Sequence, residues 1–251
     1  MSEINLFFVV SPYPKTGSTL LVKSIGQHPS CGNLDPGENF ILGRMLNGLA
    51  WMDKSQALWQ IMNKVESGWQ ERVKEFCLQM INPRSMTASI YGTKFSDFSN
   101  LQFLKDLFPQ AYFIGIYRDP RDAYSSYAAM EKSRGHYVKT AQQWCERFMN
   151  PFGGFGVCDY VVDYANLVHS FDEELKNVFE ALKLSPHSIK KEDLKWIFKD
   201  FSAQSQNNRT NLDESEPITS KRIGRYKNEL SETESKIILQ YQEKNREKWI
   251  F

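Results

Sequence analysis

Short apolar runs alternate along the chain with stretches in which apolar residues recur every three or four positions. The first apolar run covers residues 6–10 and stops at Ser11. A loop with two prolines and a glycine follows, and apolar residues then return at helical spacing at positions 20, 21, 22 and 25. Because the run predicts a buried strand and the spacing predicts a helix, the expected order is strand, tight loop, helix.

The same order recurs further along the chain. Strands are predicted at residues 88–94, 111–116 and 159–163, and they are followed by helical patterns at 101–108, 118–130 and 171–182. Other helical patterns cover 41–81, 138–148 and 194–201, and a final helix is expected to begin with a capping box of Ser231 and Glu234. This alternation predicts a single α/β domain over residues 1–251, with a parallel sheet flanked by helices on both faces.

The first loop carries groups suited to an anion. Lys15, Gly17, Ser18 and Thr19 supply a cation, a bare backbone and two hydroxyls at the start of a predicted helix. The first turn of a helix leaves its amide groups unpaired and its dipole positive, so such a loop can hold phosphate or sulfate. The alternative is an ordinary turn between strand and helix that binds no ligand.

A second segment of this kind favours the ligand interpretation. Residues 117–127 follow the apolar run at 111–116 and open another helix, with proline in its first turn. This segment contains Arg118, Arg121 and two adjacent serines. Two such turns at one sheet point to an anionic ligand.

At these residues the chain resembles the sulfotransferases that use 3'-phosphoadenosine 5'-phosphosulfate (PAPS). Residues 14–19, which include Thr16, resemble that family's loop for the 5'-phosphosulfate. Arg118 with Ser126 resembles its clamp for the 3'-phosphate, and residues 224–230 are similar to its Gly-x-aromatic-Lys-Asn segment. The resemblance implies a fold like that of the P-loop NTPases and an enzyme that releases the desulfonated nucleotide PAP.

Other positions gain roles only through this resemblance. Lys94 ends a strand in an aromatic-Gly-x-Lys pattern and is implied to be catalytic, together with Lys15. Tyr164 occupies the place of a tyrosine near the adenine. Residues 202–223 resemble a mobile lid over the nucleotide, and four positions at its end or just beyond it are implied to bind the cofactor: Lys221, Arg222, Gly224 and Arg225.

The base that takes the acceptor's proton is less clearly marked. Some branches of the family use a glutamate after the first helix, and Glu38 best matches that placement. A partly buried carboxylate is a competent base if burial raises its pKa. Asp97 is the next candidate, and Asp35 and His28 stay open as alternatives.

Composition narrows the possible partners. The net charge of +1 creates no overall field for nucleic acid or anionic membranes, so neither partner is expected. No apolar stretch approaches the roughly 20 residues that span a bilayer.

The four cysteines, Cys31, Cys77, Cys145 and Cys158, and the four histidines show no metal-ligand spacing, so no metal is expected. Buried, reduced thiols and the absence of a signal-peptide pattern predict a cytoplasmic protein.

The sequence therefore predicts an enzyme that moves a sulfuryl group from PAPS to a hydroxyl or amine of a small-molecule acceptor. Its aromatic content of 14% weakly favours an apolar or aromatic alcohol. A P-loop nucleotide kinase or NTPase is the rival enzyme, although its lysine would follow the last glycine of the loop, whereas Lys15 precedes Gly17. A non-catalytic nucleotide-binding protein with the same fold is the third reading.

Overall fold

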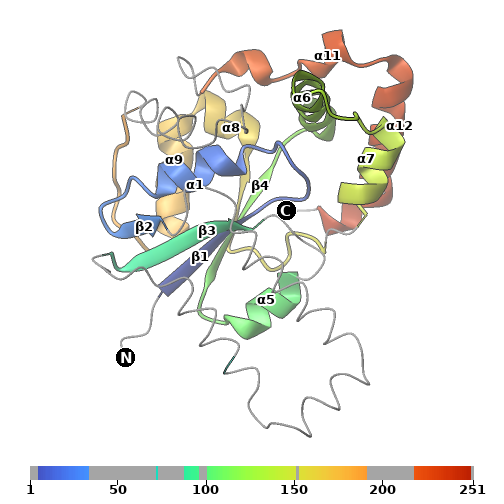
Figure 1. Cartoon of the computed structure of the whole chain (residues 1–251). Coiled ribbons are helices and arrows are strands. Elements are labelled where there is room, and N and C mark those ends of the chain that lie inside the picture. The colour runs from blue at the N-terminus through green and yellow to red at the C-terminus, as the bar shows by residue number, and fades with distance from the viewer. Residues whose placement is uncertain are drawn as a thin grey trace, which may run out of the picture.

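Five parallel strands form one sheet in the part of the chain that the computed structural model describes, residues 5–33, 72, 88–95, 101–150, 153–190 and 218–249 (Figure 1). The strands are β1 Asn5–Val10, β2 Cys31–Asn33, β3 Ile90–Phe95, β4 Tyr112–Tyr117 and β5 Tyr160–Asp163. Their order in space is β2-β3-β1-β4-β5. The predicted fold class, a parallel sheet with helices on both faces, is confirmed.

The central strand β1 sets the position of the loops. It pairs in parallel with β3 and β4, and Val9 lies opposite both Lys94 and Ile114. The carboxyl ends of these three strands therefore meet at one edge of the sheet. The chain continues from β1 toward β2 on one side and later crosses to β4 on the other, and ligands of open α/β sheets bind at such switch points.

Alternation along β1 builds two separate cores. Leu6, Phe8 and Val10 pack on one face of the sheet, and Phe7 and Val9 pack on the other. The first face is covered by α5 Leu101–Leu107, α6 Pro120–Ser133, α7 Ala141–Phe148 and α12 Glu232–Lys244. The second is covered by α1 Ser18–Ile25, α8 Tyr164–His169 and α9 Phe171–Ala181.

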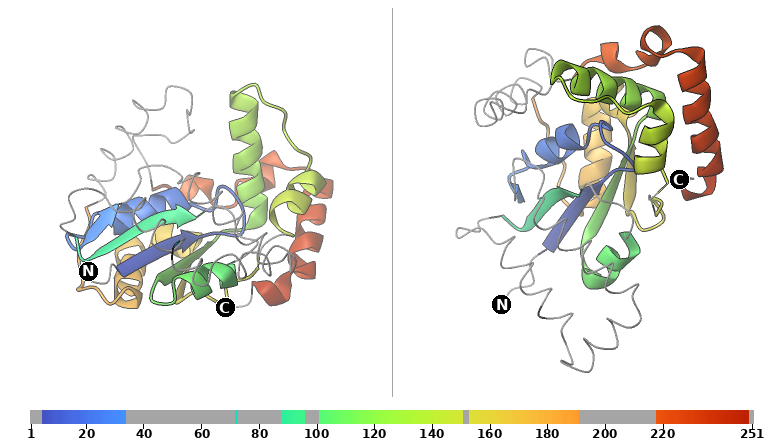
Figure 2. Two further views of the ribbon diagram at one scale, coloured as in Figure 1. Left: turned by 60° about the horizontal axis from the view of Figure 1, so that its bottom comes forward. Right: turned by 45° about the vertical axis from the view of Figure 1, so that its right-hand side comes forward.

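The C-terminal part of the chain lies against α6. It contains the short elements η1 Ser220–Arg222, α11 Tyr226–Glu229 and η2 Arg246–Lys248. Figure 2 shows α6 extending from the end of the sheet, with the C-terminal helices beside it. The end of the chain and the helix after β4 thus share one side of the molecule.

Two sequence predictions need correction. The helix predicted from residue 118 begins at Pro120, because the Asp119 side chain accepts a hydrogen bond from the Arg121 N–H and caps the helix there. Cys158 is half-buried, whereas Cys31 and Cys145 are buried as predicted. The helices predicted at 41–81 and 194–201 and most of the predicted lid lie outside the described residues, apart from Arg72 and residues 218–223.

A capping box begins α7. The Thr140 hydroxyl accepts a hydrogen bond from the Gln143 N–H at 3.3 Å, and the Gln143 side chain accepts one from the Thr140 N–H at 3.1 Å. Replacing an N-cap threonine with alanine usually destabilises a protein by about 1 kcal/mol. Thr140→Ala should therefore lower the free energy of unfolding by about that amount in chemical denaturation, whereas Thr140→Ser should stay close to wild type. Equal losses in both variants would show that the methyl group, rather than the cap, matters.

Candidate active site

The loop between β1 and α1 adopts a backbone conformation that requires glycine at one position. Gly17 has a φ of 99° and Lys15 a φ of 72°, so both lie in the left-handed region. A Cβ atom built on Gly17 would lie 2.5 Å from Cδ2 of Tyr164. Gly17 is therefore needed for its φ angle and for the close approach of the Tyr164 ring.

The same loop holds a buried hydroxyl that has no hydrogen-bond partner among the described residues. Thr16 is fully buried, and its Oγ1 makes no hydrogen bond within the described part of the chain. Helix α1 follows directly, and its N-cap Gly17 offers no side-chain cap to the first amide groups. A buried hydroxyl next to an uncapped helix N-terminus fits an anion that accepts from both.

Lys94 reaches this loop from the neighbouring strand. Its Nζ donates a hydrogen bond to Oγ1 of Thr19 at 3.0 Å, which joins the end of β3 to the first turn of α1. The parallel pairing of β1 with β3 brings these two residues together. The structure thus places the two lysines predicted to be catalytic, Lys15 and Lys94, at the same loop.

Lys15 lies in a strongly positive environment. Burial is the main reason that its pKa falls from 10.5 to about 8. Four positive charges lower it further, those of Arg134, Lys94, Arg222 and Arg118. A group of cations that repel one another in a folded protein is suited to a ligand with several negative charges.

Arg118 connects three parts of the site. Its side chain is 5% exposed and donates from Nη1 to the Lys15 carbonyl at 2.9 Å and from Nη2 to the Arg222 carbonyl at 2.6 Å. Its guanidinium carbon lies 4.5 Å from the centre of the Tyr164 ring. Its Nε is buried and makes no hydrogen bond within the described residues. The arginine therefore joins the β1 loop, the C-terminal segment and α8.

The surroundings of Tyr164 differ from those that the sequence suggests. Gly17 approaches its ring closely, Arg118 stacks on it, and only 4% of the residue is exposed. A ring covered in this way has little surface left for an adenine base. The tyrosine ring instead packs against the loop at Gly17. The adenine position near Tyr164, which the resemblance to the family implies, stays a prediction.

Ser126 lies on α6, nearly two turns after Pro120, and is half-buried. The two hydrogen bonds of Arg118 go to main-chain carbonyls. The joint binding of a 3'-phosphate by Arg118 and Ser126 therefore stays a prediction.

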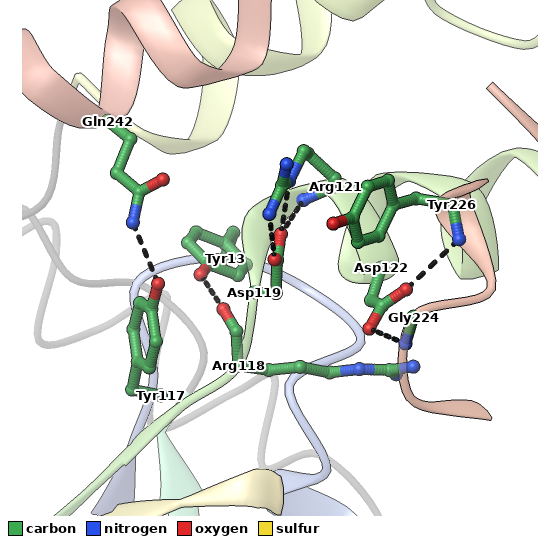
Figure 3. Close-up of polar contacts among 9 residues, drawn as sticks. All are labelled: Tyr13, Tyr117, Arg118, Asp119, Arg121, Asp122, Gly224, Tyr226 and Gln242. Atoms are coloured by element: carbon green, nitrogen blue, oxygen red, sulfur yellow. Dashed lines mark hydrogen bonds and ion pairs between the residues drawn. The ribbon is translucent and has the colours of Figure 1, made fainter. Parts of the chain in front are cut away.

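Residues 219–226, which we call the basic segment, pack against the start of α6. Both oxygens of Asp122 accept main-chain hydrogen bonds from this segment, one from the Gly224 N–H and one from the Tyr226 N–H (Figure 3). Arg121 lies over the Tyr226 ring, with its guanidinium carbon 3.9 Å from the ring centre. The residues directly after the predicted lid are thus attached to the start of α6, close to Arg118 in the sequence.

The cations of the basic segment differ in their surroundings. Arg222 is half-buried, and its charge acts on Lys15. Lys221 is exposed, and Arg225 forms an ion pair with Glu229 at 2.8 Å. Among the predicted cofactor residues of this segment, Arg222 is therefore the one whose charge acts on Lys15 in the loop.

Comparison with known proteins shows the family and the fold of the chain. A model of the sulfotransferase family matches residues 7–188. The chain belongs to the sulfotransferase family. No curated protein sequence matches the chain at a significant level.

Solved sulfotransferase structures share the fold. The sulfotransferase domain of the Synechococcus PCC 7002 olefin synthase matches with a TM-score of 0.52 and 16% identity, over 98% of this chain and 97% of that domain. Mouse sulfotransferase SULT7A1, solved as a complex with PAP, matches with a TM-score of 0.52 and 13% identity, over 98% and 86%. Sulfotransferase STF9 from Mycobacterium avium matches with a TM-score of 0.50 and 12% identity, over 97% and 77%.

Of the four candidates for the base that takes the acceptor's proton, the structure describes one, His28. Glu38, Asp35 and Asp97 lie outside the described residues. His28 lies beyond the end of α1 that is remote from the loop, where its Nδ1 accepts from the Ser30 N–H and its Nε2 faces the Ser185 carbonyl, both at 3.0 Å. Because both ring nitrogens are engaged away from the loop, the structure argues against His28 as the base.

Sequence reasoning missed two residues of the site. Asp122 lies four residues after Arg118, in the first turn of α6, but spacing alone cannot show that its partners are main-chain amides far along the chain. Arg134 follows α6, and its charge has the largest effect on Lys15 after burial. Nothing in the local pattern distinguishes it from the other exposed or half-buried cations.

Within the described ranges, no three His, Cys, Asp or Glu side chains lie together as a metal site would require. In the same part of the chain, no helix is long and apolar enough to cross a membrane.

The charge of Lys15 should destabilise the free protein. Its pKa in the folded state, about 8, lies below its ordinary value of 10.5, so the penalty is fully present below pH 8 and disappears as the pH rises toward 10.5. Lys15→Met should therefore raise the free energy of unfolding by roughly 1–3 kcal/mol at pH 7 and by less at pH 9.5. Chemical denaturation at the two pH values measures both. A gain of the same size at each pH would assign the effect to apolar packing.

Gly17→Ala should combine backbone strain with a clash against Tyr164. Gly135 provides a matched control, because its φ is +69° and a Cβ atom there would meet nothing within 4 Å. The left-handed backbone alone costs a non-glycine residue roughly 1–2 kcal/mol. We expect Gly135→Ala to destabilise by about that amount and Gly17→Ala by clearly more in denaturation experiments. The excess should shrink when Tyr164 is also replaced by alanine, and an unchanged excess would contradict the assigned contact.

Proposed function

We propose that this sulfotransferase family member transfers the sulfuryl group of PAPS to a hydroxyl or amine of a small-molecule acceptor. The observation that carries the proposal is the set of cations around one loop. Lys15 lies in this loop, Lys94 reaches it from β3 and Arg118 reaches it from the residue after β4. The buried Thr16 hydroxyl within the loop has no partner among the described residues. This arrangement supports an anion with several charges at the switch point of the sheet.

The parts of the donor would be distributed over the site. The loop of residues 14–19 and the N-terminus of α1 would hold the 5'-phosphosulfate. Arg118, Ser126 and the basic segment, including Arg222, would hold the 3'-phosphate. A 3'-phosphate distinguishes this donor from ATP, so its contacts would provide the selectivity.

Lys15 and Lys94 would act on the leaving group. The acceptor oxygen or nitrogen forms a bond to sulfur while the bond from sulfur to the bridging phosphate oxygen breaks, and negative charge builds on that phosphate. Cations already placed at this position stabilise the charge without reorganising. Phosphate groups would also raise the pKa of Lys15 above its free value of about 8, which keeps the ammonium charged at neutral pH.

The acceptor's proton would pass to a carboxylate. Glu38 stays our proposed base on the basis of its place in the sequence, with Asp97 and Asp35 as alternatives. We propose an apolar or aromatic alcohol as acceptor and the cytoplasm as location. The three described cysteines are free, which fits a reducing compartment.

Nucleotide selectivity tests the proposal. PAP should stabilise the purified protein against thermal unfolding more than adenosine 5'-phosphate or ATP with Mg²⁺, because a ligand that binds the folded state stabilises it by mass action. At about 100 times the dissociation constant the gain approaches 2.7 kcal/mol. Calorimetric titration with each nucleotide provides the affinities.

Other outcomes have distinct meanings. Selective stabilisation by ATP with Mg²⁺ would favour a kinase or NTPase. PAP binding without PAPS consumption across a panel of phenols, aliphatic alcohols and amines would favour a non-catalytic nucleotide-binding protein. A protein that PAP does not stabilise would contradict the proposed donor.

A further inference from the structure

Asp122 is a buried carboxylate whose two oxygens hold the same segment. It is 2% exposed, Oδ2 accepts from the Gly224 N–H at 2.7 Å, and Oδ1 accepts from the Tyr226 N–H at 3.1 Å. Figure 3 shows its side chain pointing from α6 toward these amides. A carboxylate that accepts from two amide groups forms stronger hydrogen bonds than a neutral acceptor does.

The backbone of the basic segment is shaped for this contact. Gly224 has a φ of +74°, in the left-handed region, and α11 begins two residues later, at Tyr226. The turn presents two amide groups to one side chain. Gly224 and Tyr226 are more than 100 positions from Asp122 in the sequence, so the contact fastens the basic segment to α6.

A second attachment links the same segment to the loop. Arg118 donates to the carbonyl of Arg222, two residues before Gly224, and also to the carbonyl of Lys15. Asp122 also acts on Arg118 electrostatically and favours its charged form. The position of the Arg222 charge relative to Lys15 therefore depends on Asp122 and Arg118 together.

We propose that Asp122 is a positioning residue for the nucleotide. It holds the basic segment so that Arg222 faces the phosphate groups, and it acts through that segment without touching the nucleotide. The inference rests on the proposed function, because it takes PAP as the nucleotide.

The test compares Asp122→Asn and Asp122→Ala with Thr140→Ala. Thr140 lies in the cap of α7 and makes none of these contacts, so its variant controls for a general loss of stability. Each protein is titrated with PAP and with adenosine 5'-phosphate. Hydrogen exchange of the Gly224 and Tyr226 amides is measured in the proteins without nucleotide.

Asp122→Asn retains one carbonyl acceptor and should bind PAP several-fold more weakly. Asp122→Ala should lose about tenfold or more, as expected when a hydrogen bond to a charged group is removed. Adenosine 5'-phosphate should lose less, so the ratio of the two affinities should fall. The Gly224 and Tyr226 amides should exchange faster in both variants, whereas Thr140→Ala should change neither the ratio nor these amides. If Asp122→Ala does not fold, Asp122→Asn carries the comparison.

The outcomes separate the two proposals. If wild type prefers PAP and Asp122→Asn keeps the same preference, the positioning role is wrong and the proposed function stands. Unchanged exchange at Gly224 and Tyr226 would overturn the attachment itself, whatever the nucleotide data show. A wild-type protein with no preference for PAP would overturn the proposed function, and the role of Asp122 in nucleotide binding with it.

Discussion

The buried guanidinium of Arg118 is the interaction on which the rest of the site depends. It donates to carbonyls in the loop after β1 and in the basic segment, and it stacks on the tyrosine at the start of α8. Burying a cation is expensive unless its donors find acceptors. Two main-chain carbonyls accept from the terminal nitrogens of Arg118 and one aromatic ring covers its face, whereas Nε has no acceptor among the described residues. These contacts hold together segments that are far apart in the sequence.

This arrangement places positive charges close together. Burial is the main cause of the lowered pKa of Lys15, and repulsion by these neighbouring cations lowers it further. The two cores on either side of the sheet supply the stability that makes such a site tolerable. The free protein is thus strained electrostatically at the place where an anionic ligand would relieve the strain, as is common at functional sites.

The sheet determines which residues can take part. Parallel pairing of β1 with β3 and β4 puts the loop, Lys94 and Arg118 at the same edge. Asp122 lies in the first turn of α6, four residues after Arg118, and holds the basic segment at that edge. The solved sulfotransferase structures that resemble the chain at 12–16% identity share this fold, which indicates that the arrangement of strands tolerates extensive sequence change.

Local patterns in the sequence predicted four of the five described strands, the helices that follow them and the tight loop that contains Gly17, because each depends on neighbouring residues. The short strand β2 was not among the predicted strands. Apolar runs and helical spacing mark buried elements, and only glycine readily adopts the left-handed conformation of that loop. The resemblance to sulfotransferases also pointed to Lys15, Lys94 and Arg118, which the structure brings to one edge of the sheet. The partners of Arg118, the covered ring of Tyr164 and the contact of Asp122 with Gly224 were decided by the tertiary structure alone. Hydrogen bonds between residues about a hundred positions apart depend on how whole elements pack against one another. A local pattern of side chains therefore cannot predict them.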